Sequence, residues 1–262
     1  MDLGLDNKCV LVTGGAKGIG AATVESFASE GCQVALVDRD VKNGSELAQV
    51  LGPDVTFIEA DLTTAEACQA AVNQVVSYFG GLDILVNNAG FNDGLGLEAS
   101  PEDFMVAVRG NLLHVYAMTH YALPKLRKGP GCIVNLGSKV SVTGQGHTSA
   151  YAAAKGAITA LTREWAVALA AEEIRVNCVI PAECLTDQYE QFFQSQSNPE
   201  ATRKAVGDLV PLGRRLTTPE EVAQTIVFLA SGKASHTTGQ LIFVDGGYTH
   251  IDRAVGHDHS KW

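Results

Sequence analysis

Short apolar runs alternate with segments of helical periodicity along most of the chain. Seven runs have the length and β-branched content of buried strands: CVLVT (9–13), QVALV (33–37), VTFIEA (55–60), LDILV (82–86), CIVNL (132–136), IRVNCVI (174–180) and LIFVDGG (241–247). Helical sequence follows each of the first six, apart from loop insertions. Because parallel strands need crossover connections, this alternation predicts an α/β fold with a seven-stranded parallel sheet, flanked by helices and doubly wound.

Two later helices are predicted from their start signals. SPEDFMVAV has Ser100 as N-cap, Pro101 at the first position and acidic residues in the first turn, and TPEEVAQTIVFLA repeats these features from Thr218. The sequence contains no evident linker, repeat or low-complexity tract. We therefore expect a single domain that covers residues 1–262.

The overall charge restricts the range of partners. The chain has 262 residues, 46% of them apolar and 18% charged, and a formal net charge of -10. Nucleic acids and anionic membrane surfaces attract clustered Lys and Arg, so neither is expected as the main partner. The N-terminal MDLGLDNK lacks the features of a signal peptide, and no apolar run approaches the ~18 residues of a membrane span. We therefore expect a soluble, cytoplasmic protein.

Cysteines and histidines give no sign of a disulfide framework or a metal site. The six cysteines are scattered and form no C-x-x-C motif: Cys9, Cys32, Cys68, Cys132, Cys178 and Cys184. Several lie in strand-like segments, so we expect them to be reduced and mostly buried. His257 and His259 stand in a polar terminus, a context that favours an unstructured tail over metal binding. No bound metal is expected.

The segment TGGAKGIG (13–20) connects the first predicted strand to the first predicted helix. In such a turn Gly14 permits the tight bend, Gly18 lets the backbone approach a pyrophosphate, and Gly20 allows the helix to pack closely on the strand. Free amides and the helix dipole attract phosphates there. A dinucleotide site at the carboxyl ends of the strands is therefore predicted.

The end of the second predicted strand bears on which dinucleotide binds. Asp38 stands there, where a carboxylate can accept both adenosine ribose hydroxyls and repel a 2′-phosphate. Lys17 and Arg39 act in the opposite sense, because a nearby cation can accept that phosphate. The prediction is NAD, with NADP as the alternative.

One helical segment, SAYAAAKGAITAL (149–161), carries a phenol and an ammonium among small apolar residues. Tyr151 and Lys155 lie one turn apart on the same helix face. Taken alone, they fit a Tyr at the edge of the core and a Lys that extends to water. Together with TGGAKGIG, NNAG (87–90) and Ser138, however, the segment resembles the short-chain dehydrogenase/reductase family, from Lys8 to about Tyr248.

The resemblance implies a Rossmann-type fold, an NAD(P)-dependent oxidoreductase and a homotetramer. It also implies a catalytic tetrad: Asn111, Ser138, Tyr151 and Lys155. The cofactor residues predicted from the strand ends and from the resemblance are Gly14, Lys17, Gly18, Ile19, Gly20, Asp38, Arg39, Asp61, Leu62, Asn88, Ala89, Gly90, Tyr151, Lys155, Pro181, Glu183, Cys184 and Thr186.

The tetrad residues receive the following roles. Tyr151 is the general base for alcohol oxidation, with a pKa lowered by the Lys155 ammonium and by the charge of a bound nicotinamide. Lys155 also holds the nicotinamide ribose, and Ser138 hydrogen-bonds the reacting oxygen. Asn111 follows Gly110 inside a helical pattern, where a local kink is expected. The family resemblance gives Asn111 the role of holding a water that links Lys155 to solvent.

The segment after the sixth strand departs from the family pattern P-G-x-x-x-T. It reads PAECLT (181–186), so Ala182 replaces Gly and Glu183 adds a carboxylate beside the expected nicotinamide. An unpaired carboxylate is costly beside an apolar substrate, which favours a polar one. The predicted substrate residues are Asn92, Asp93, Ser138, Lys139, Gln145, His147, Tyr151 and Glu183.

Such a cluster of donors and acceptors suits a sugar or polyol. Within the family, NDGLGL, VTGQGHTSAY and VIPAE are similar to bacterial sugar dehydrogenases of the L-fucose dehydrogenase type, which implies oxidation of an anomeric hydroxyl to a lactone. Two alternatives remain open. One is a carbonyl reductase of 3-oxoacyl thioesters, and the other is a dinucleotide sensor without catalysis, although the complete tetrad argues against the sensor.

Overall fold

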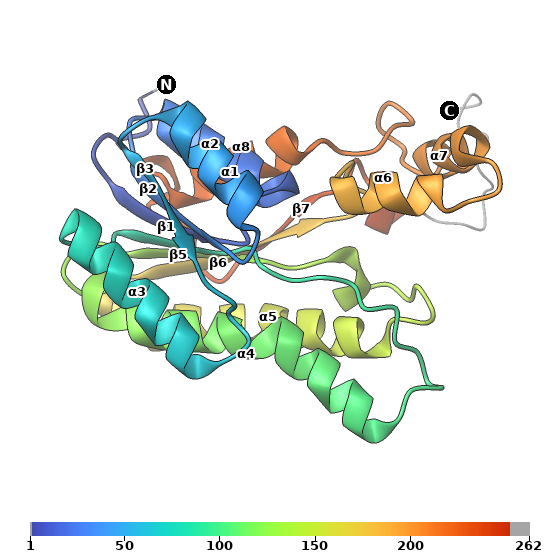
Figure 1. Cartoon of the computed structure of the whole chain (residues 1–262), viewed down its shortest axis with the longest axis horizontal. Helices are drawn as coiled ribbons and strands as arrows, with labels where there is room; N and C mark the ends of the chain where they lie inside the picture. The colour runs from blue at the N-terminus through green and yellow to red at the C-terminus, as the bar shows by residue number, and fades with distance from the viewer. Residues whose placement is uncertain (1, 252–262) are drawn as a thin grey trace.

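The computed structural model describes residues 2–251, and His257 and His259 lie outside this range (Figure 1). All strands in its sheet are parallel, in the order β3-β2-β1-β4-β5-β6-β7. The strand bounds are β1 Cys9–Thr13, β2 Gln33–Asp38, β3 Val55–Glu59, β4 Ile84–Asn87, β5 Cys132–Leu136, β6 Arg175–Pro181 and β7 Leu241–Val244. The predicted α/β class and seven parallel strands are confirmed.

Helices cover both faces of the sheet. Their bounds are α1 Gly18–Ser29, α2 Val41–Leu51, α3 Ala65–Phe79, α4 Pro101–Leu126, α5 Ser149–Ala168, α6 Asp187–Gln194, α7 Pro199–Asp208 and α8 Pro219–Ala230. Helices α1, α2 and α8 lie on one face and α3, α4 and α5 on the other, while α6 and α7 extend beyond the ends of the strands (Figure 1). This arrangement buries the strands on both faces, which explains their nearly continuous apolar sequence.

Both predicted helix starts are confirmed. Ser100 caps α4 by accepting the Asp103 N–H, and Pro101 is the first residue of the helix. Thr218 and Glu221 form a reciprocal capping box at the start of α8. Helix α4 continues from Pro101 to Leu126 without interruption at Asn111.

The core consists of apolar residues on the two sides of the sheet. One cluster includes Val10, Val34 and Phe27 under α1 and α8, and the other includes Leu11 and Leu85 under α3 and α4. All six cysteines are buried and free, as predicted. Within residues 2–251, no helix is both long enough and apolar enough to cross a membrane.

The strand order reverses between β1 and β4. From β1 the chain moves outward to β2 and β3, and then returns to β4 on the other side of β1. In doubly wound sheets, ligands bind at the carboxyl ends of the strands beside such a reversal. The turns after β1, β2 and β4 therefore define the place to look for a site.

Candidate active site

The turn after β1 has the backbone geometry that its glycines predict. Gly14 and Gly18 have φ values of 63° and 54°, in the left-handed region that favours glycine. A Cβ on Gly20 would lie 1.9 Å from the Gly14 carbonyl oxygen, and one on Gly18 would lie 3.2 Å from Thr186 Cγ2. The turn is thus packed tightly against the body of the protein and faces Thr186 across a narrow space.

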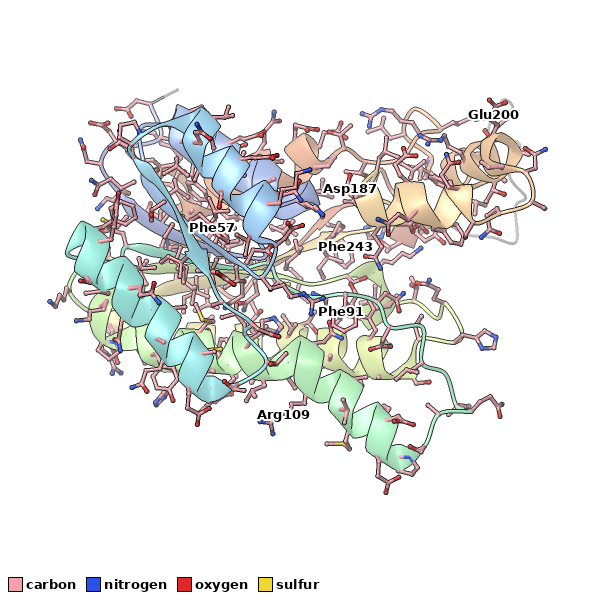
Figure 2. The ribbon with its side chains drawn as sticks, viewed as in Figure 1. Phe57, Phe91, Arg109, Asp187, Glu200 and Phe243 are labelled. Atoms are coloured by element: carbon pink, nitrogen blue, oxygen red, sulfur yellow. The ribbon has the colours of Figure 1, made fainter. Side chains whose placement is uncertain are left out.

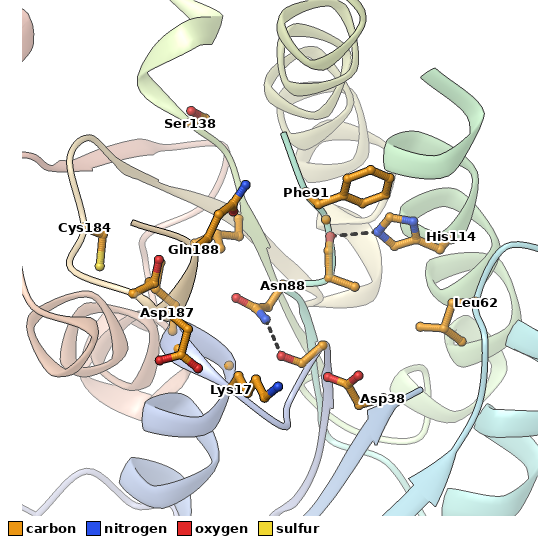
Figure 3. A pocket seen from close by; sticks show the side chains of 18 of the residues that line it. Lys17, Asp38, Leu62, Asn88, Phe91, His114, Ser138, Cys184, Asp187 and Gln188 are labelled. Atoms are coloured by element: carbon orange, nitrogen blue, oxygen red, sulfur yellow. Dashed lines mark hydrogen bonds between the residues drawn. The ribbon is translucent and has the colours of Figure 1, made fainter. Parts of the chain in front are cut away.

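The NNAG turn after β4 is held against the glycine turn. Asn88 Nδ2 donates hydrogen bonds to the carbonyl oxygens of Thr13 and Gly14, both at 2.9 Å (Figure 3). The Asn88 and Ala89 amides donate to Thr13 Oγ1 at 3.0 and 3.1 Å. The two turns therefore form one rigid unit.

Asp38 is fixed at the end of β2. Its carboxylate accepts the Ala16 N–H at 3.1 Å and the Asp40 N–H at 3.0 Å. Lys17, the first of the two predicted phosphate-binding cations, forms an ion pair with Asp40 at 2.5 Å. This contact raises the pKa of Lys17 and lowers the pKa of Asp40 to about 2. Arg39 is exposed at the same edge.

Lys155 is buried and its ammonium lies over the ring of Tyr151, the predicted general base. Its Nζ donates to the Leu136 carbonyl at 2.7 Å and lies 5.6 Å from the centroid of the Tyr151 ring. Burial lowers the pKa of Lys155 to about 8. The ammonium therefore binds the last residue of β5, the strand that leads to Ser138.

The expected effect of Lys155 on Tyr151 is not seen in the protein chain itself. Burial raises the pKa of the Tyr151 phenol, the Ser138 hydroxyl hydrogen bond lowers it, and the Asp93 carboxylate raises it further. The burial effect is the largest of the three. Of these three influences, the Ser138 hydrogen bond is the one that lowers the pKa and so favours a Tyr151 phenolate.

Asn111 is fully buried on α4 and binds the backbone beside the NNAG turn. Its Oδ1 accepts the Phe91 N–H at 2.9 Å, and its Nδ2 donates to the Ala107 carbonyl at 3.3 Å. A Cβ on Gly90 would lie 3.3 Å from Asn111 Oδ1 and 3.4 Å from Lys155 Nζ. Only a glycine leaves this narrow space between the amide and the ammonium open.

These features surround one cavity of about 560 Å³ (Figure 3). It is lined by three tetrad residues, Ser138, Tyr151 and Lys155, while Asn111 lies behind its wall. All of the predicted cofactor residues except Glu183 line it: Gly14, Lys17, Gly18, Ile19, Gly20, Asp38, Arg39, Asp61, Leu62, Asn88, Ala89, Gly90, Tyr151, Lys155, Pro181, Cys184 and Thr186. Open glycine turns at a helix N-terminus, with a carboxylate at the next strand end, fit a dinucleotide.

Several lining residues were not predicted. Phe91 follows the NNAG turn, and helix α6 adds Asp187, Gln188, Tyr189 and Gln191 (Figures 2 and 3). His114 also lines the cavity, and its Nε2 lies 2.9 Å from the Ala89 carbonyl oxygen. Burial lowers the pKa of His114 to about 4. Its position three residues after Asn111, on the same helix face, was a signal that could have identified it.

Four of the predicted substrate residues lie in two neighbouring loops and do not line the cavity. Asn92 and Asp93 accept the backbone N–H groups of Gly94 and Leu95, at 3.1 and 3.0 Å. Gln145 and His147 are exposed. The Ser149 N–H donates to the Leu95 carbonyl at 2.7 Å, so the two loops lie side by side. Asp93 comes nearest the tetrad, with Oδ2 at 3.5 Å from Asn111 Nδ2.

Lys139 and Glu183 require a correction. The sequence predicted an unpaired carboxylate facing the substrate, but Glu183 is buried and forms an ion pair with Lys139. Neither side chain lines the cavity. Ala182, which replaces the family glycine, has no positive φ, so the substitution leaves the local backbone unstrained. Among residues 2–251 no cluster of potential ligands suits a metal ion.

Comparisons with known proteins agree with this geometry. A family model described as enoyl-(acyl carrier protein) reductase matches residues 14–249. L-fucose dehydrogenase from Mus musculus is 41% identical over 242 residues, which cover 92% of this chain and 88% of the mouse protein. A rat L-fucose dehydrogenase is 40% identical over the same length, so these relatives are mammalian, whereas the sequence motifs predicted bacterial ones.

Solved structures extend the similarity to three dimensions. The crystal structure of Cj0485 dehydrogenase is 45% identical, with a TM-score of 0.93, and covers 97% of this chain and 98% of its own. L-sorbose reductase from Gluconobacter frateurii, complexed with NADPH and L-sorbose, is 31% identical, with a TM-score of 0.90 and coverage of 96% and 100%. The chain belongs to the short-chain dehydrogenase/reductase family of NAD(P)-dependent oxidoreductases.

Proposed function

We propose that this protein is an NAD-dependent sugar dehydrogenase that oxidises the anomeric hydroxyl of L-fucose, or of a related aldose, to a lactone. The observation that carries the proposal is the convergence of Ser138, Tyr151 and Lys155 at one end of a cavity whose other end carries Asp38 and the glycine turn. The 41% identity to an L-fucose dehydrogenase supports the choice of sugar.

A bound nicotinamide dinucleotide supplies the acceptor for the hydride that leaves the sugar carbon. The chain supplies the proton chemistry. Ser138 holds the substrate hydroxyl by a hydrogen bond, and Tyr151 takes its proton as the general base. Lys155 places a positive charge below the phenol. Asn111 Oδ1 accepts the Phe91 N–H at 2.9 Å and so fixes the backbone after the NNAG turn. In the chain itself, the hydrogen bond with Ser138 lowers the pKa of Tyr151 and so opposes the effect of burial.

The preference for NAD follows from four charged side chains around the end of β2. Asp38 is fixed by two backbone amides and faces the position of an adenosine ribose. Asp40 engages Lys17 and so weakens one of the two cations that favour a 2′-phosphate. Arg39 remains as the group that permits some use of NADP.

A panel of aldoses with NAD and with NADP tests the proposal, read by the absorbance of the reduced cofactor. The expected result is turnover of L-fucose or a close stereochemical relative, with a higher kcat/KM for NAD. Absence of turnover with every aldose would overturn the substrate assignment.

A second candidate is reduction of 3-oxoacyl thioesters, which the same tetrad can catalyse in the reverse direction. It is favoured by the 38% identity, over 248 residues, to a 3-oxoacyl-[acyl-carrier-protein] reductase from Thermotoga maritima. The net charge of -10 argues against it, because acidic acyl carriers bind basic surfaces. Reduction of an acetoacetyl thioester at a rate above that of aldose oxidation would establish this alternative.

We further infer that the chain is a single domain that assembles as a homotetramer. Tyr116 on α4 and Val167 on α5 leave 55% and 80% of their surfaces exposed in the isolated chain. Apolar exposure on two adjacent helices favours a subunit interface. Native mass spectrometry gives the oligomeric state directly, and a monomer would contradict the inference.

A further inference from the structure

Lys139 and Glu183 stand next to cavity residues but face away from the cavity. Ser138 lines the cavity and Lys139 does not, while Ala182 and Cys184 line it on either side of Glu183. Lys139 starts a short 3-10 helix, and residues 182 and 183 lie in a bend after β6. Because neither charged side chain lines the cavity, the two groups meet behind its wall.

The two side chains form a buried ion pair. Lys139 Nζ donates to Glu183 Oε1, and the residues are 7% and 6% exposed. Lys139 Nζ also lies 4.4 Å from the centroid of the Tyr248 ring. Buried charges are stable only when they are paired. The ion pair therefore couples the position of the segment that carries Lys139 to that of the segment that carries Glu183.

Each partner belongs to a segment that has its own backbone anchors. The Glu183 carbonyl accepts the Thr217 N–H at 2.9 Å, and the Leu185 N–H donates to the Thr217 carbonyl at 2.8 Å. On the other side, the Lys139 carbonyl accepts the Val142 N–H at 2.9 Å in the short 3-10 helix that follows Ser138. The ion pair therefore connects two structured segments at the ends of neighbouring strands, β5 and β6.

Glu183 also has a buried oxygen, Oε2, without a hydrogen-bond partner. A group of this kind is unfavourable for stability and therefore needs an explanation. A role for the other oxygen, Oε1, would explain why the residue is kept in spite of this cost. Oε1 binds Lys139, the residue next to Ser138.

We propose that Lys139 and Glu183 are positioning residues, whose ion pair fixes the Ser138 hydroxyl relative to Tyr151. This inference rests on the role proposed for Ser138. It replaces the expectation that Glu183 binds the sugar directly. Without the ion pair, only the backbone anchors would hold the two segments, and the Ser138 hydroxyl would shift relative to the phenol. The reaction would then lose the hydrogen bond that holds the substrate oxygen and stabilises the Tyr151 phenolate.

The test compares the wild type with Glu183→Gln, Lys139→Met and the double variant. A single substitution leaves one buried charge without its partner and can prevent folding, whereas the double variant removes both charges. For the double variant we expect kcat to fall by about tenfold or more, because small displacements of catalytic groups have effects of this size. The sugar KM and the Kd of NAD from calorimetry should change by less than about threefold.

The pH profile supplies a readout that a purely structural role would not change. Because the Ser138 hydrogen bond lowers the pKa of Tyr151, its loss should move the rise of kcat/KM to higher pH. Each single variant that folds should have the same kcat as the double variant, because both residues act through one ion pair and their effects do not add. The matched control removes another ion pair, distant from the cavity, by Arg127→Met and Glu172→Gln, and should keep wild-type kcat.

Two results would overturn the proposal. A double variant with wild-type kcat and pH profile, but a changed Tm, would show that the pair only stabilises the fold. A rise in sugar KM that disappears with one deoxy analogue would show that Glu183 binds that hydroxyl directly. If the wild type oxidises no aldose, the proposed function fails separately, and the same variants are then compared on the best carbonyl substrate.

Discussion

The two ends of the cavity are built from different parts of the chain. The cofactor end consists of turns directly after β1, β2 and β4, where Gly14, Asp38 and Asn88 are held by backbone hydrogen bonds. The substrate end is lined by Phe91, after the NNAG turn, and by several residues of the segment 182–191 after β6, such as Gln188. Regular sheet geometry therefore fixes the first end, while loop conformation determines the second.

This difference separates binding from chemistry. The cofactor end needs only backbone amides, glycines and one carboxylate, so it can be preformed by the sheet. The groups proposed to catalyse the reaction lie away from Asp38 and the glycine turn, where Tyr151 and Lys155 project from α5 and Ser138 follows β5. Substitutions at the two ends should consequently affect different measured quantities.

Tyr151→Phe should show the largest effect and the clearest separation. Removing the phenol eliminates the general base but keeps the ring, so kcat should fall by about 10²- to 10⁴-fold. The Kd of NAD from calorimetry should stay close to the wild-type value. Turnover within about tenfold of the wild type would remove Tyr151 from the proposed role.

Gly20→Ala tests the rigidity of the cofactor end. The new Cβ would lie 1.9 Å from the Gly14 carbonyl oxygen, so α1 must move away from the turn. Overpacking of this kind should lower the free energy of unfolding by about 1–3 kcal/mol and weaken NAD binding. The measurements are urea unfolding and calorimetry.

Gly81→Ala is the matched control, because its Cβ would meet no atom within 4 Å. Its free energy of unfolding should stay within about 0.5 kcal/mol of the wild type. Equal behaviour of the two variants would mean that the glycine turn is not tightly packed.

His114 should make the stability of the protein sensitive to acid. Burial lowers its pKa from 6.5 to about 4. Between these two pH values the unfolded chain binds a proton at His114 and the folded chain does not, so stability falls as the pH is lowered. Between pH 7 and pH 5 the wild type should lose about 2 kcal/mol more unfolding free energy than His114→Asn. Equal losses in the two proteins, by urea unfolding, would contradict the burial of a neutral imidazole.

Asp38→Ala should have the smallest of these effects. Loss of the carboxylate removes the partner of the ribose hydroxyls and the repulsion of a 2′-phosphate, so the ratio of kcat/KM for NAD over NADP should fall by about tenfold, or about 1.4 kcal/mol. Asp40→Asn, which releases Lys17, should shift the ratio in the same direction. A wild type that prefers NADP would show that the cations outweigh the carboxylate.

The sequence predicts the cofactor end better than the substrate end for a physical reason. Asp38 ends β2, and Gly18 and Thr186 follow β1 and β6 within a few residues. Parallel strands bring their carboxyl ends to one edge of the sheet, so these residues meet there. The orientation of Glu183 depends instead on the local backbone after β6, and its partner Lys139 is 44 residues away in the chain. Periodicity gives no information about such a contact.

The titration of Tyr151 illustrates the same limit. Its spacing from Lys155 correctly places both residues at the cavity, but the pKa depends on how deeply the phenol is buried and on which hydroxyl reaches it. Both factors are tertiary. Helix α6 was also not predicted to be a wall of the cavity. Its polar residues resemble those of any exposed helix.

Transfer of deuterium from L-fucose labelled at C1 is the most direct measurement of the central claim, that the tetrad oxidises an anomeric carbon. The labelled sugar is incubated with NAD, and the reduced cofactor and the sugar product are examined by NMR and mass spectrometry. The account predicts deuterium in the reduced cofactor and a lactone, or the acid from its hydrolysis, in equal amounts, with neither formed by Tyr151→Phe. Reduced cofactor without deuterium, or a product oxidised at another carbon, would contradict the account.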